Sequence, residues 1–274
     1  MIFFDKLVLI RGGGDLATGV AYRLHQAGFP IIVTEVAAPT AVRRTVAFAQ
    51  AVFSGEHTVE GVTAVRVEQA ARAREMALAG GVPVLVDPRD GVITTLRPAI
   101  LVDARLLKRP NVASKKQAPL VIGLGPGFTG GVNCHAAIET NRGHWLGRVL
   151  WDSAAQANTG IPGVTLGFRE ERILRSPAAG VFHPTVDFGD HVEQGQTVGH
   201  IDADGASTPV KPRLSGAVRG LVHPGLSVHK GMKIGDVDPR DDPTYIFTIS
   251  DKSLAIGGAV LTAVLMWMNR RNAE

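Results

Sequence analysis

The stretch RGGGDLATGVAYRLHQAGFPIIVTE, residues 11–35, follows the apolar run KLVLI at residues 6–10, and together they decide the fold. A short continuous apolar run is typical of a strand buried on both faces. From Asp15 onward apolar residues recur every three to four positions, which predicts a helix that Gly28 ends. A second apolar run at residues 31–33 predicts another strand. This order of strand, glycine turn, helix and strand predicts a βαβ unit and an α/β fold.

The glycine turn has the register of a dinucleotide-binding loop. Gly12, Gly14 and Ala17 match G-x-G-x-x-G/A, and Glu35 follows 21 residues after Gly14. In this motif the glycines allow a tight turn and a close approach of the backbone to a pyrophosphate, and the acidic residue binds a ribose hydroxyl. A tight turn without a ligand remains the alternative. The predicted cofactor-binding residues here are Gly12, Gly13, Gly14, Asp15, Leu16, Ala17 and Glu35.

Three charged residues near this loop each allow more than one role. Asp15 at the start of the helix favours the helix dipole but would repel a phosphate, so we expect it to cap the helix. Arg43 and Arg44 follow the second strand and could bind an additional phosphate, although exposure to solvent explains them equally well. They lie in residues 39–53, where Pro39 and the apolar spacing predict a second helix.

Further candidates follow two other apolar runs. Residues 99–107 include Asp103, which we expect at the carboxyl edge of the sheet, where open α/β sheets bind ligands; capping of the strand end is the alternative. PLVIGLGPGF, residues 119–128, predicts a strand entering a second glycine-rich turn. Its N–H groups could bind an anion, or the turn could be a simple connection. The cofactor-binding candidates of this turn are Gly123, Gly125, Pro126, Gly127 and Phe128.

Residues 133–148 are rich in groups capable of chemistry. Glu139, Arg142 and His144 are candidates for catalysis or ligand binding, together with Asp103; a polar helix end with charge pairs is the alternative reading. Cys134 is the single cysteine, and a lone cysteine is more often a small buried hydrophobe than a nucleophile. The spacing of a zinc site is lacking, so we predict no metal.

An internal repeat defines a second region. Residues 180–202 and 216–238 align without a gap at an offset of 36, with glycines and aliphatic residues at matching positions. Repeated short apolar pairs between glycine turns predict a small β-sandwich of two related halves. SPAAGVF, residues 176–182, and GDHVEQGQTVGHI, residues 189–201, resemble biotinyl or lipoyl carrier domains. In those carriers a lysine on the hairpin between the halves receives the cofactor. DADGAST, residues 202–208, has none and Lys211 is too distant, so we expect no biotin or lipoate.

The overall composition is that of a globular protein, with 45% hydrophobic and 20% charged residues among 274. A net charge of +4 without a long basic run argues against nucleic-acid binding. A single cysteine and the lack of room for a leader before residue 6 predict a cytoplasmic protein. The apolar run at residues 254–268 is short for a membrane span and is expected to be a buried helix. A homo-oligomer is left open.

We therefore predict three segments. Residues 1–170 form a Rossmann-like nucleotide-binding domain with a mostly parallel sheet. Residues 171–240 form the inserted biotinyl/lipoyl-like module without an attachment lysine. Residues 241–274, with a strand at TYIFTI and a helix from Ser250, return to the first domain.

Several segments resemble the YqeB-type family assigned to maturation of selenium-dependent molybdenum hydroxylases. They include RGGGDLATGVA, TEVAAPTAVRRTVAF, GLGPGFTGGVNCHAAIETNRGHWLGRVLW and VHKGMKIGDVDPR. The resemblance implies an accessory protein that helps to complete or insert a molybdenum cofactor, with the hydroxylase or its maturation machinery as partner. It does not specify a reaction or catalytic residues.

Three functions therefore remain open. The first is an accessory protein that binds a nucleotide or a molybdopterin dinucleotide, whose pyrophosphate suits two glycine-rich turns. The second is an NAD(P)-dependent oxidoreductase, since the loop and Glu35 suit that cofactor as well, with Glu139 or His144 as acid or base. The third is a non-catalytic scaffold that docks a hydroxylase, or a sulfur- or selenium-delivery enzyme, through the β module.

Overall fold

The computed structural model describes residues 2–107, 114–158, 160 and 163–271. The chain divides into two compact units. Unit 1 comprises Met1–Ala37, Ala47–Thr159 and Ile249–Glu274, and unit 2 comprises Ala38–Val46 and Gly160–Thr248. The β module therefore lies within an insertion between two segments of the α/β unit.

Unit 1 is built on a nine-stranded mixed sheet in the order β3-β4-β5-β2-β1-β6-β7-β8-β9. Its strands are β1 (Val8–Arg11), β2 (Ile31–Glu35), β3 (Glu56–Val59), β4 (Val62–Val67), β5 (Val82–Val86), β6 (Ile100–Asp103), β7 (Leu120–Leu124), β8 (Ala136–Ile138) and β9 (Val149–Leu150). The strands from β4 to β8 in this order are parallel, and β3 and β9 are antiparallel edges. The predicted α/β class is confirmed at this level.

The strand order reverses at β1. The chain proceeds from β1 to β2 and β5 on one side, and β6, β7 and β8 follow on the other side. The carboxyl ends of β1 and β6 are therefore adjacent, with Arg11 opposite Asp103 in the register. In open parallel sheets such a reversal leaves a crevice between diverging connections, where ligands bind.

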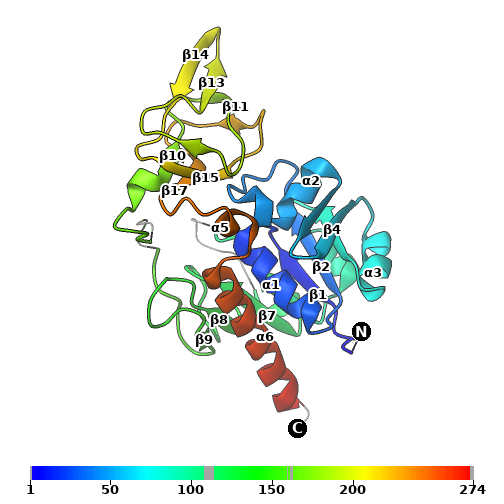
Figure 1. Cartoon of the computed structure of the whole chain (residues 1–274). Helices are drawn as coiled ribbons and strands as arrows, with labels where there is room; N and C mark the ends of the chain where they lie inside the picture. The colour runs from blue at the N-terminus through cyan, green and yellow to red at the C-terminus, as the bar shows by residue number, and fades with distance from the viewer. Residues whose placement is uncertain (1, 108–113, 159, 161–162, 272–274) are drawn as a thin grey trace. The chain divides into compact units, whose positions relative to one another are not determined.

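Helices pack on both faces of this sheet (Figure 1). The helices of the chain are α1 (Asp15–Gln26), α2 (Ala51–Ser54), α3 (Ala70–Leu78), α4 (Val92–Leu96), α5 (Thr244–Phe247) and α6 (Asp251–Arg271), with 3-10 turns η1 (Arg44–Val46), η2 (Phe48–Gln50), η3 (Lys115–Gln117) and η4 (Glu170–Arg172). Helices α1 and α6 pack together. A Cβ on Gly19 would lie 2.5 Å from the Ser253 carbonyl oxygen, so the absence of a side chain permits this close crossing.

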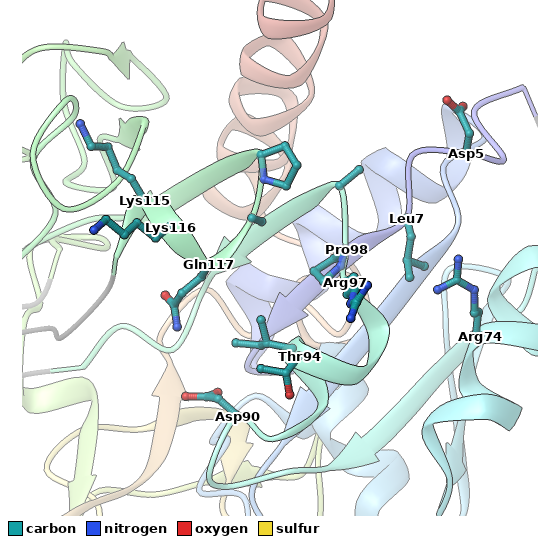
Figure 2. Close-up of a pocket in the computed structure, with 14 residues that line it drawn as sticks. Asp5, Leu7, Arg74, Asp90, Thr94, Arg97, Pro98, Lys115, Lys116 and Gln117 are labelled. Atoms are coloured by element: carbon teal, nitrogen blue, oxygen red, sulfur yellow. The ribbon is translucent and has the colours of Figure 1, made fainter.

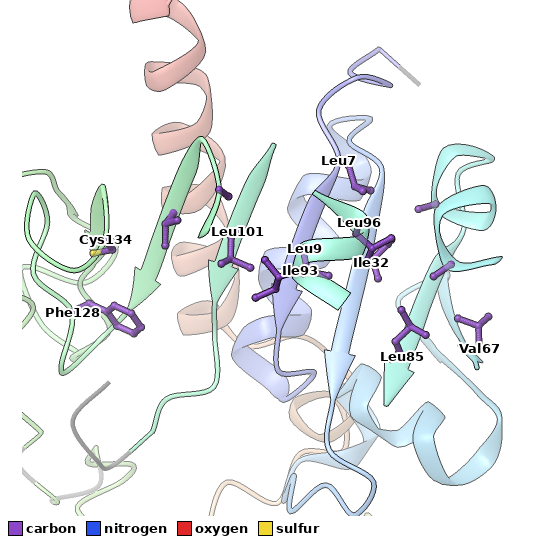
Figure 3. Packing of buried hydrophobic residues seen from close by; sticks show 14 of the residues in the cluster. Leu7, Leu9, Ile32, Val67, Leu85, Ile93, Leu96, Leu101, Phe128 and Cys134 are labelled. Carbon is purple, nitrogen blue, oxygen red and sulfur yellow. The ribbon is translucent and has the colours of Figure 1, made fainter. Parts of the chain in front are cut away.

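The opposite face carries α3 and α4 over a hydrophobic core, shown in Figure 3. Leu9, Ile32, Leu85 and Leu101 point into this core from four neighbouring parallel strands. Alternate residues of a strand point to opposite faces, so the continuous apolar runs of these strands bury both sides. The sheet is thereby fixed as the rigid support of the loops at its carboxyl edge.

Two predicted elements differ from the structure. Residues 39–53 do not form one helix: residues 38–46 belong to unit 2, and only η2 and α2 follow in unit 1. TYIFTI was expected to be a strand, but Thr244–Phe247 forms the short helix α5. Its apolar residues were too few to distinguish the two periods, because a short apolar run fits either.

Unit 2 contains two four-stranded sheets, β10-β17-β15-β12 and β14-β13-β11-β16. The strands are β10 (Ile173–Arg175), β11 (Gly180–Pro184), β12 (His191–Val192), β13 (Gly199–Ala203), β14 (Ala206–Val210), β15 (Gly216–Leu221), β16 (Ser227–Val228) and β17 (Lys233–Asp238). Strands β11 and β15, and likewise β12 and β16, are equivalent in the repeat. Each half contributes its short middle strand to the other sheet, since β12 pairs with β15 and β16 with β11. The antiparallel module predicted from the repeat is confirmed.

The core of unit 2 consists of residues that recur at the offset of the repeat. Val192 and Val228, and Val198 and Ile234, are such pairs and all lie in one buried cluster with Phe182. The long hairpin β13–β14 turns at Asp204 and Gly205 (Figure 1). Its residues from 199 to 210 include no lysine.

Helix α6 extends from Asp251 to Arg271 and is therefore longer than the apolar run at residues 254–268. By length and composition, residues 244–270 could cross a membrane, and 44% of the most apolar window is buried. A core helix passes the same test. Helix α6 packs on α1 and on the strands β7 to β9, and its buried apolar residues are Ile256, Ala259, Val260, Ala263 and Val264.

Candidate functional site

The glycine loop between β1 and α1 contains three glycines in different environments. Gly12 has φ +93°, which favours glycine, and a Cβ there would lie 3.3 Å from the Ala104 backbone. A Cβ on Gly13 would lie 2.8 Å from the Ala49 nitrogen. Conformation explains the first glycine, and packing against η2 explains the second.

Gly14 differs from both. It is the N-cap of α1 with φ −66° and ψ 178°, a conformation that every residue adopts, and a Cβ would meet no atom within 4 Å. Neither strain nor packing therefore requires glycine here. N-cap positions favour Ser, Thr, Asp, Asn and Gly, and only the first four have side chains that bind the first N–H groups of the helix. Glycine instead leaves the backbone at the start of α1 accessible from an open space.

Two acidic side chains flank this loop. The Oε2 atom of Glu35 accepts a hydrogen bond from the Gly13 N–H at 2.7 Å, and its Oε1 atom accepts one from the Val36 N–H. Glu35 is thus tied to the loop by the Gly13 N–H, and binding of a ribose hydroxyl by its carboxylate stays a prediction. Asp15 is the first residue of α1 and accepts a hydrogen bond from the Leu16 N–H at 2.9 Å, whereas the N-cap is Gly14, which has no side chain to cap the helix. Leu16 and Ala17 are buried on α1.

Four charged residues meet where the strand order reverses. Asp103 is fully buried; it accepts hydrogen bonds from Arg11 Nη1 at 3.0 Å and from Arg105 Nη2 at 2.7 Å. Asp90, on the loop between β5 and α4, accepts hydrogen bonds from Arg11 Nε at 2.8 Å and from its Nη2. Burial acts to lower the pKa of Arg105, but Asp103 and Asp90 outweigh it and raise that pKa above the usual value. We call these four residues the switch-point cluster.

The sequence pointed to Asp103 but not to Arg11 or Asp90. Arg11 ends the buried strand β1 and is 4% exposed, so its charge requires buried partners. An arginine directly after a fully apolar run was the feature of the sequence that could have indicated a buried charged group. Asp90 gave no pattern, because only the fold of the β5–α4 loop brings it to Arg11, 79 residues away in sequence.

Arg43 and Arg44 belong to unit 2, where their guanidinium groups bind carbonyl oxygens. Arg43 donates to Tyr245 O and Thr248 O at 3.1 Å, and Arg44 Nε donates to Leu221 O at 2.8 Å. Within this unit they hold the segment of residues 38–46 against α5 and β15. Phosphate binding by these arginines stays a prediction.

The second glycine-rich turn is filled largely by its own side chains. A Cβ on Gly123 would overlap the ring of Phe128, which is 1% exposed and lies in the core near Cys134. Gly125 and Gly127 have φ +72° and +89°, and Gly125 donates its N–H to Ile138 O at 2.9 Å. Pro126 lies between them. Packing and conformation thus account for these glycines, and binding of an anion at this turn stays a prediction.

The three candidates after β8 have separate surroundings. Glu139 is 2% exposed and accepts hydrogen bonds from the backbone N–H groups of Asn141 and Gln156, both at 2.7 Å. Arg142 forms two hydrogen bonds with Asp251, at 2.7 and 2.8 Å, and His144 packs edge-on against Trp145. Glu139 therefore orders the loop, and His144 is exposed.

Lys252 was not predicted from the sequence, and it lies between the residues after β8 and the start of α1, since it interacts electrostatically with Glu139, Arg142 and Asp15. It is the second residue of α6 and is half-buried. Burial lowers the pKa of Lys252, and Arg142 acts in the same direction, whereas Asp15 and Glu139 oppose the shift. Its ammonium group therefore lies within electrostatic reach of Asp15 at the start of α1. Only the packing of α6 on α1 brings it there.

Among the described residues, no group of three or more His, Cys, Asp or Glu side chains is placed so that it could hold a metal ion. Cys134 is buried, and burial raises the pKa of its thiol to about 11.

Comparison with known proteins bears separately on the β module and on the whole chain. The family described as "Biotin-requiring enzyme" matches residues 173–237. Among solved structures, urea carboxylase from Kluyveromyces lactis is 27% identical over 33% of this chain and 8% of that chain, with a TM-score of 0.24. The succinylglutamate desuccinylase/aspartoacylase from Rhodobacter sphaeroides is 17% identical over 85% of both chains, with a TM-score of 0.28. Scores this low carry no argument about fold or activity.

One curated relative covers almost the whole chain. The uncharacterized protein YqeB of Escherichia coli strain K12 is 49% identical over 265 residues, which are 97% of this chain and 48% of the relative. The name of the family that the sequence resembles is thus supported, while the maturation role is not tested by this similarity. The chain is similar to YqeB along nearly its whole length and spans about half the length of that relative.

Proposed function

We propose that the chain binds a phosphorylated ligand of dinucleotide type at the glycine loop, as an accessory protein in the maturation of a selenium-dependent molybdenum hydroxylase. The observation that carries the binding proposal is Gly14, which has ordinary dihedral angles and open space beside it. A helix N-terminus that is accessible in this way suits a phosphate, because its N–H groups and dipole favour negative charge.

The surroundings of the loop support the same ligand class. The strand order reverses at β1, and open parallel sheets bind ligands at such a reversal, which supports a Rossmann-like mode of binding. The Glu35 carboxylate at the Gly13 N–H suits a ribose hydroxyl, which could take over or share that hydrogen bond. Lys252 supplies a cation near the start of α1. A molybdopterin dinucleotide would present its pyrophosphate to these groups and supply the chemistry of the hydroxylase after delivery.

The accessory role rests on the resemblance to YqeB-type proteins. A protein with this role would hold the cofactor by its phosphates and release it to a hydroxylase. It would need no catalytic residue of its own, which agrees with the structural roles of Glu139 and Arg142 in hydrogen bonds and an ion pair.

The binding proposal is tested by Gly14→Val, with Gly258→Ala as the control. Gly258 also has no atom within 4 Å of its Cβ position and lies on α6. A ligand raises the melting temperature only of a protein that binds it in the folded state. We expect a molybdopterin dinucleotide to protect the native chain and Gly258→Ala, and not Gly14→Val. Equal protection of all three proteins would refute binding at the loop.

The accessory role is tested separately by reconstitution of a cofactor-free molybdenum hydroxylase. Addition of the chain together with a molybdopterin dinucleotide should restore hydroxylase activity faster than the dinucleotide alone, and Gly14→Val should give no acceleration. If the native chain gives none either, the accessory role is wrong even where binding is established.

An NAD(P)-dependent oxidoreductase is the second candidate, and the position of Glu35 favours it equally. Thermal protection by NADH, with none by the molybdopterin dinucleotide, would select this alternative. Glu35→Gln should then weaken NADH binding, because the amide is a poorer acceptor for the ribose hydroxyls than the carboxylate.

A further inference from the structure

A cavity lies in the part of unit 1 shown in Figure 2, and none of the glycine-loop residues lines it. Its volume is about 990 Å³. Several of its lining residues directly precede parallel strands: Leu7 precedes β1, Ala99 precedes β6 and Pro119 precedes β7. These lie at the amino edge of the sheet, whereas the glycine loop lies at the carboxyl edge. We call this cavity the α4 groove.

The groove exists because short elements cover this part of the sheet. The connection from β5 to β6 contains only the five-residue helix α4, and the described part of the connection from β6 to β7 contains the single turn η3. A helix of five residues is about 7.5 Å long, whereas a four-residue strand is about 13 Å long. Residues of α4 and η3 line the groove, and Leu7, Pro98 and Ala118 supply apolar surface.

The charge of the lining is unbalanced. Arg74, Arg97, Lys115 and Lys116 contribute four cations, and Asp5 and Asp90 contribute two carboxylates. Both carboxylates are already paired outside this set, Asp5 with Lys6 and Asp90 with Arg11. In the described part of the chain none of the four cations forms an ion pair. Arg74 donates to Leu96 O and Lys115 to Gly131 O, both of which are uncharged acceptors.

Backbone strain marks both ends of α4. Asp90 has φ +59° and Arg97 has φ +45°, a left-handed conformation that non-glycine residues adopt at a cost of about 1 kcal/mol or more. Both residues line the groove. Strained residues of this kind cluster at active sites and ligand sites, although Arg97 is also the left-handed C-cap of α4.

We propose that the α4 groove is a second ligand site, which binds a phosphorylated small molecule with an apolar or aromatic body. The cations without carboxylate partners would bind the phosphate groups, with Arg97 offering the planar guanidinium that suits two phosphate oxygens. The apolar residues would contact the body. The volume is within the range of about 300 to 1,000 Å³ that is usual for small-molecule sites. The groove shares Asp90 with the switch-point cluster but none of its lining residues with the glycine loop, and the proposal does not rest on the function proposed for that loop.

The proposal is tested by titration calorimetry of the full chain with adenosine diphosphate and with pyrophosphate. The test variant is Arg97→Gln/Lys116→Gln, which removes two exposed cations of the groove. The control is Arg72→Gln/Lys230→Gln, which removes the same charge at exposed positions outside the groove. Gly14→Val, which adds a side chain at the glycine loop, is titrated in parallel.

We expect the groove variant to lose at least about tenfold in affinity for adenosine diphosphate, while Gly14→Val and the control retain it at one site. Pyrophosphate should bind more weakly than adenosine diphosphate, because it lacks the body that contacts Leu7 and Pro98. Binding that is lost only in Gly14→Val, equal losses in the groove and control variants, or no binding to the native chain would each overturn the proposal. The first of these results would leave the glycine-loop proposal intact.

Discussion

The carboxylate of Glu35 lies 2.7 Å from the backbone nitrogen of Gly13 and accepts its hydrogen bond. The end of β2 is thereby tied to the loop that follows β1, while Gly14 beside it remains open. Two N–H groups here are occupied by the protein itself, that of Gly13 by Glu35 and that of Leu16 by Asp15. The position most accessible to a ligand is therefore Gly14, at the start of α1.

Replacing Glu35 by alanine should leave the Gly13 N–H without this acceptor. The free energy of unfolding should fall by about 1 kcal/mol, the usual net contribution of one hydrogen bond at a partly exposed site. Urea denaturation measures this change. Glu35→Gln retains an acceptor oxygen and should lose less. Equal losses in the two variants would show that the hydrogen bond is not what Glu35 contributes.

Asp103→Ala should be strongly destabilising. It removes the buried carboxylate shared by Arg11 and Arg105, and Arg11 remains buried with Asp90 as its carboxylate partner. Breaking a buried ion pair on one side costs about 3 to 5 kcal/mol. Scanning calorimetry should show a fall of roughly 2 to 4 °C for each kcal/mol in a domain of this size.

The matched control for Asp103 is Glu75→Ala, which removes the acceptor of the exposed pair with Arg72. It should change stability by less than about 0.5 kcal/mol, because exposed pairs contribute little. A loss in Asp103→Ala no larger than in this control would contradict the role given to the switch-point cluster.

His135 should make the protein sensitive to mild acid. Burial lowers its pKa and Lys115 acts in the same direction, while its Nδ1 atom accepts the Val121 N–H at 2.9 Å. The unfolded chain therefore binds a proton at higher pH than the folded protein. The free energy of unfolding should be unaffected by this group above pH about 6.5 and fall below it, until the folded histidine is also protonated.

The test compares denaturant midpoints of the native chain and His135→Asn between pH 7.5 and 5. Asparagine can accept the Val121 N–H without titrating in this range. The variant should lose less stability on acidification than the native chain. Parallel pH profiles would remove His135 as the cause of the acid sensitivity.

Cys134 should resist alkylation in the folded protein. The side chain is buried and burial raises the pKa of its thiol to about 11, so the reactive thiolate is scarce and shielded at neutral pH. Iodoacetamide at pH 8 should modify the native chain slowly and the chain in 6 M guanidinium rapidly, as mass spectrometry would show. Rapid labelling of the native protein would indicate an accessible thiol.

The local sequence was sufficient for the βαβ unit and the β module. Residues 6–35 combine a buried apolar run, a helical period and a second apolar run. Each of these patterns favours one element: a strand, a helix and a second strand. The repeat at an offset of 36 residues specified two related halves, because equivalent aliphatic residues must meet in a shared core. These features depend on local periodicity, which does not require knowledge of distant contacts.

Tertiary structure alone decided which charged groups meet. Arg11 and Asp90 are 79 residues apart, and Lys252 comes near Asp15 through the packing of α6 on α1. Likewise, the three loop glycines cannot be told apart from the sequence alone. Only the tertiary structure shows that Gly12 is needed for its positive φ, that Gly13 is needed for close packing, and that Gly14 leaves the backbone accessible. The hydrophobic periodicity of a segment reflects which of its faces packs on the core. Which charged side chains pair depends instead on which distant segments the complete fold brings together.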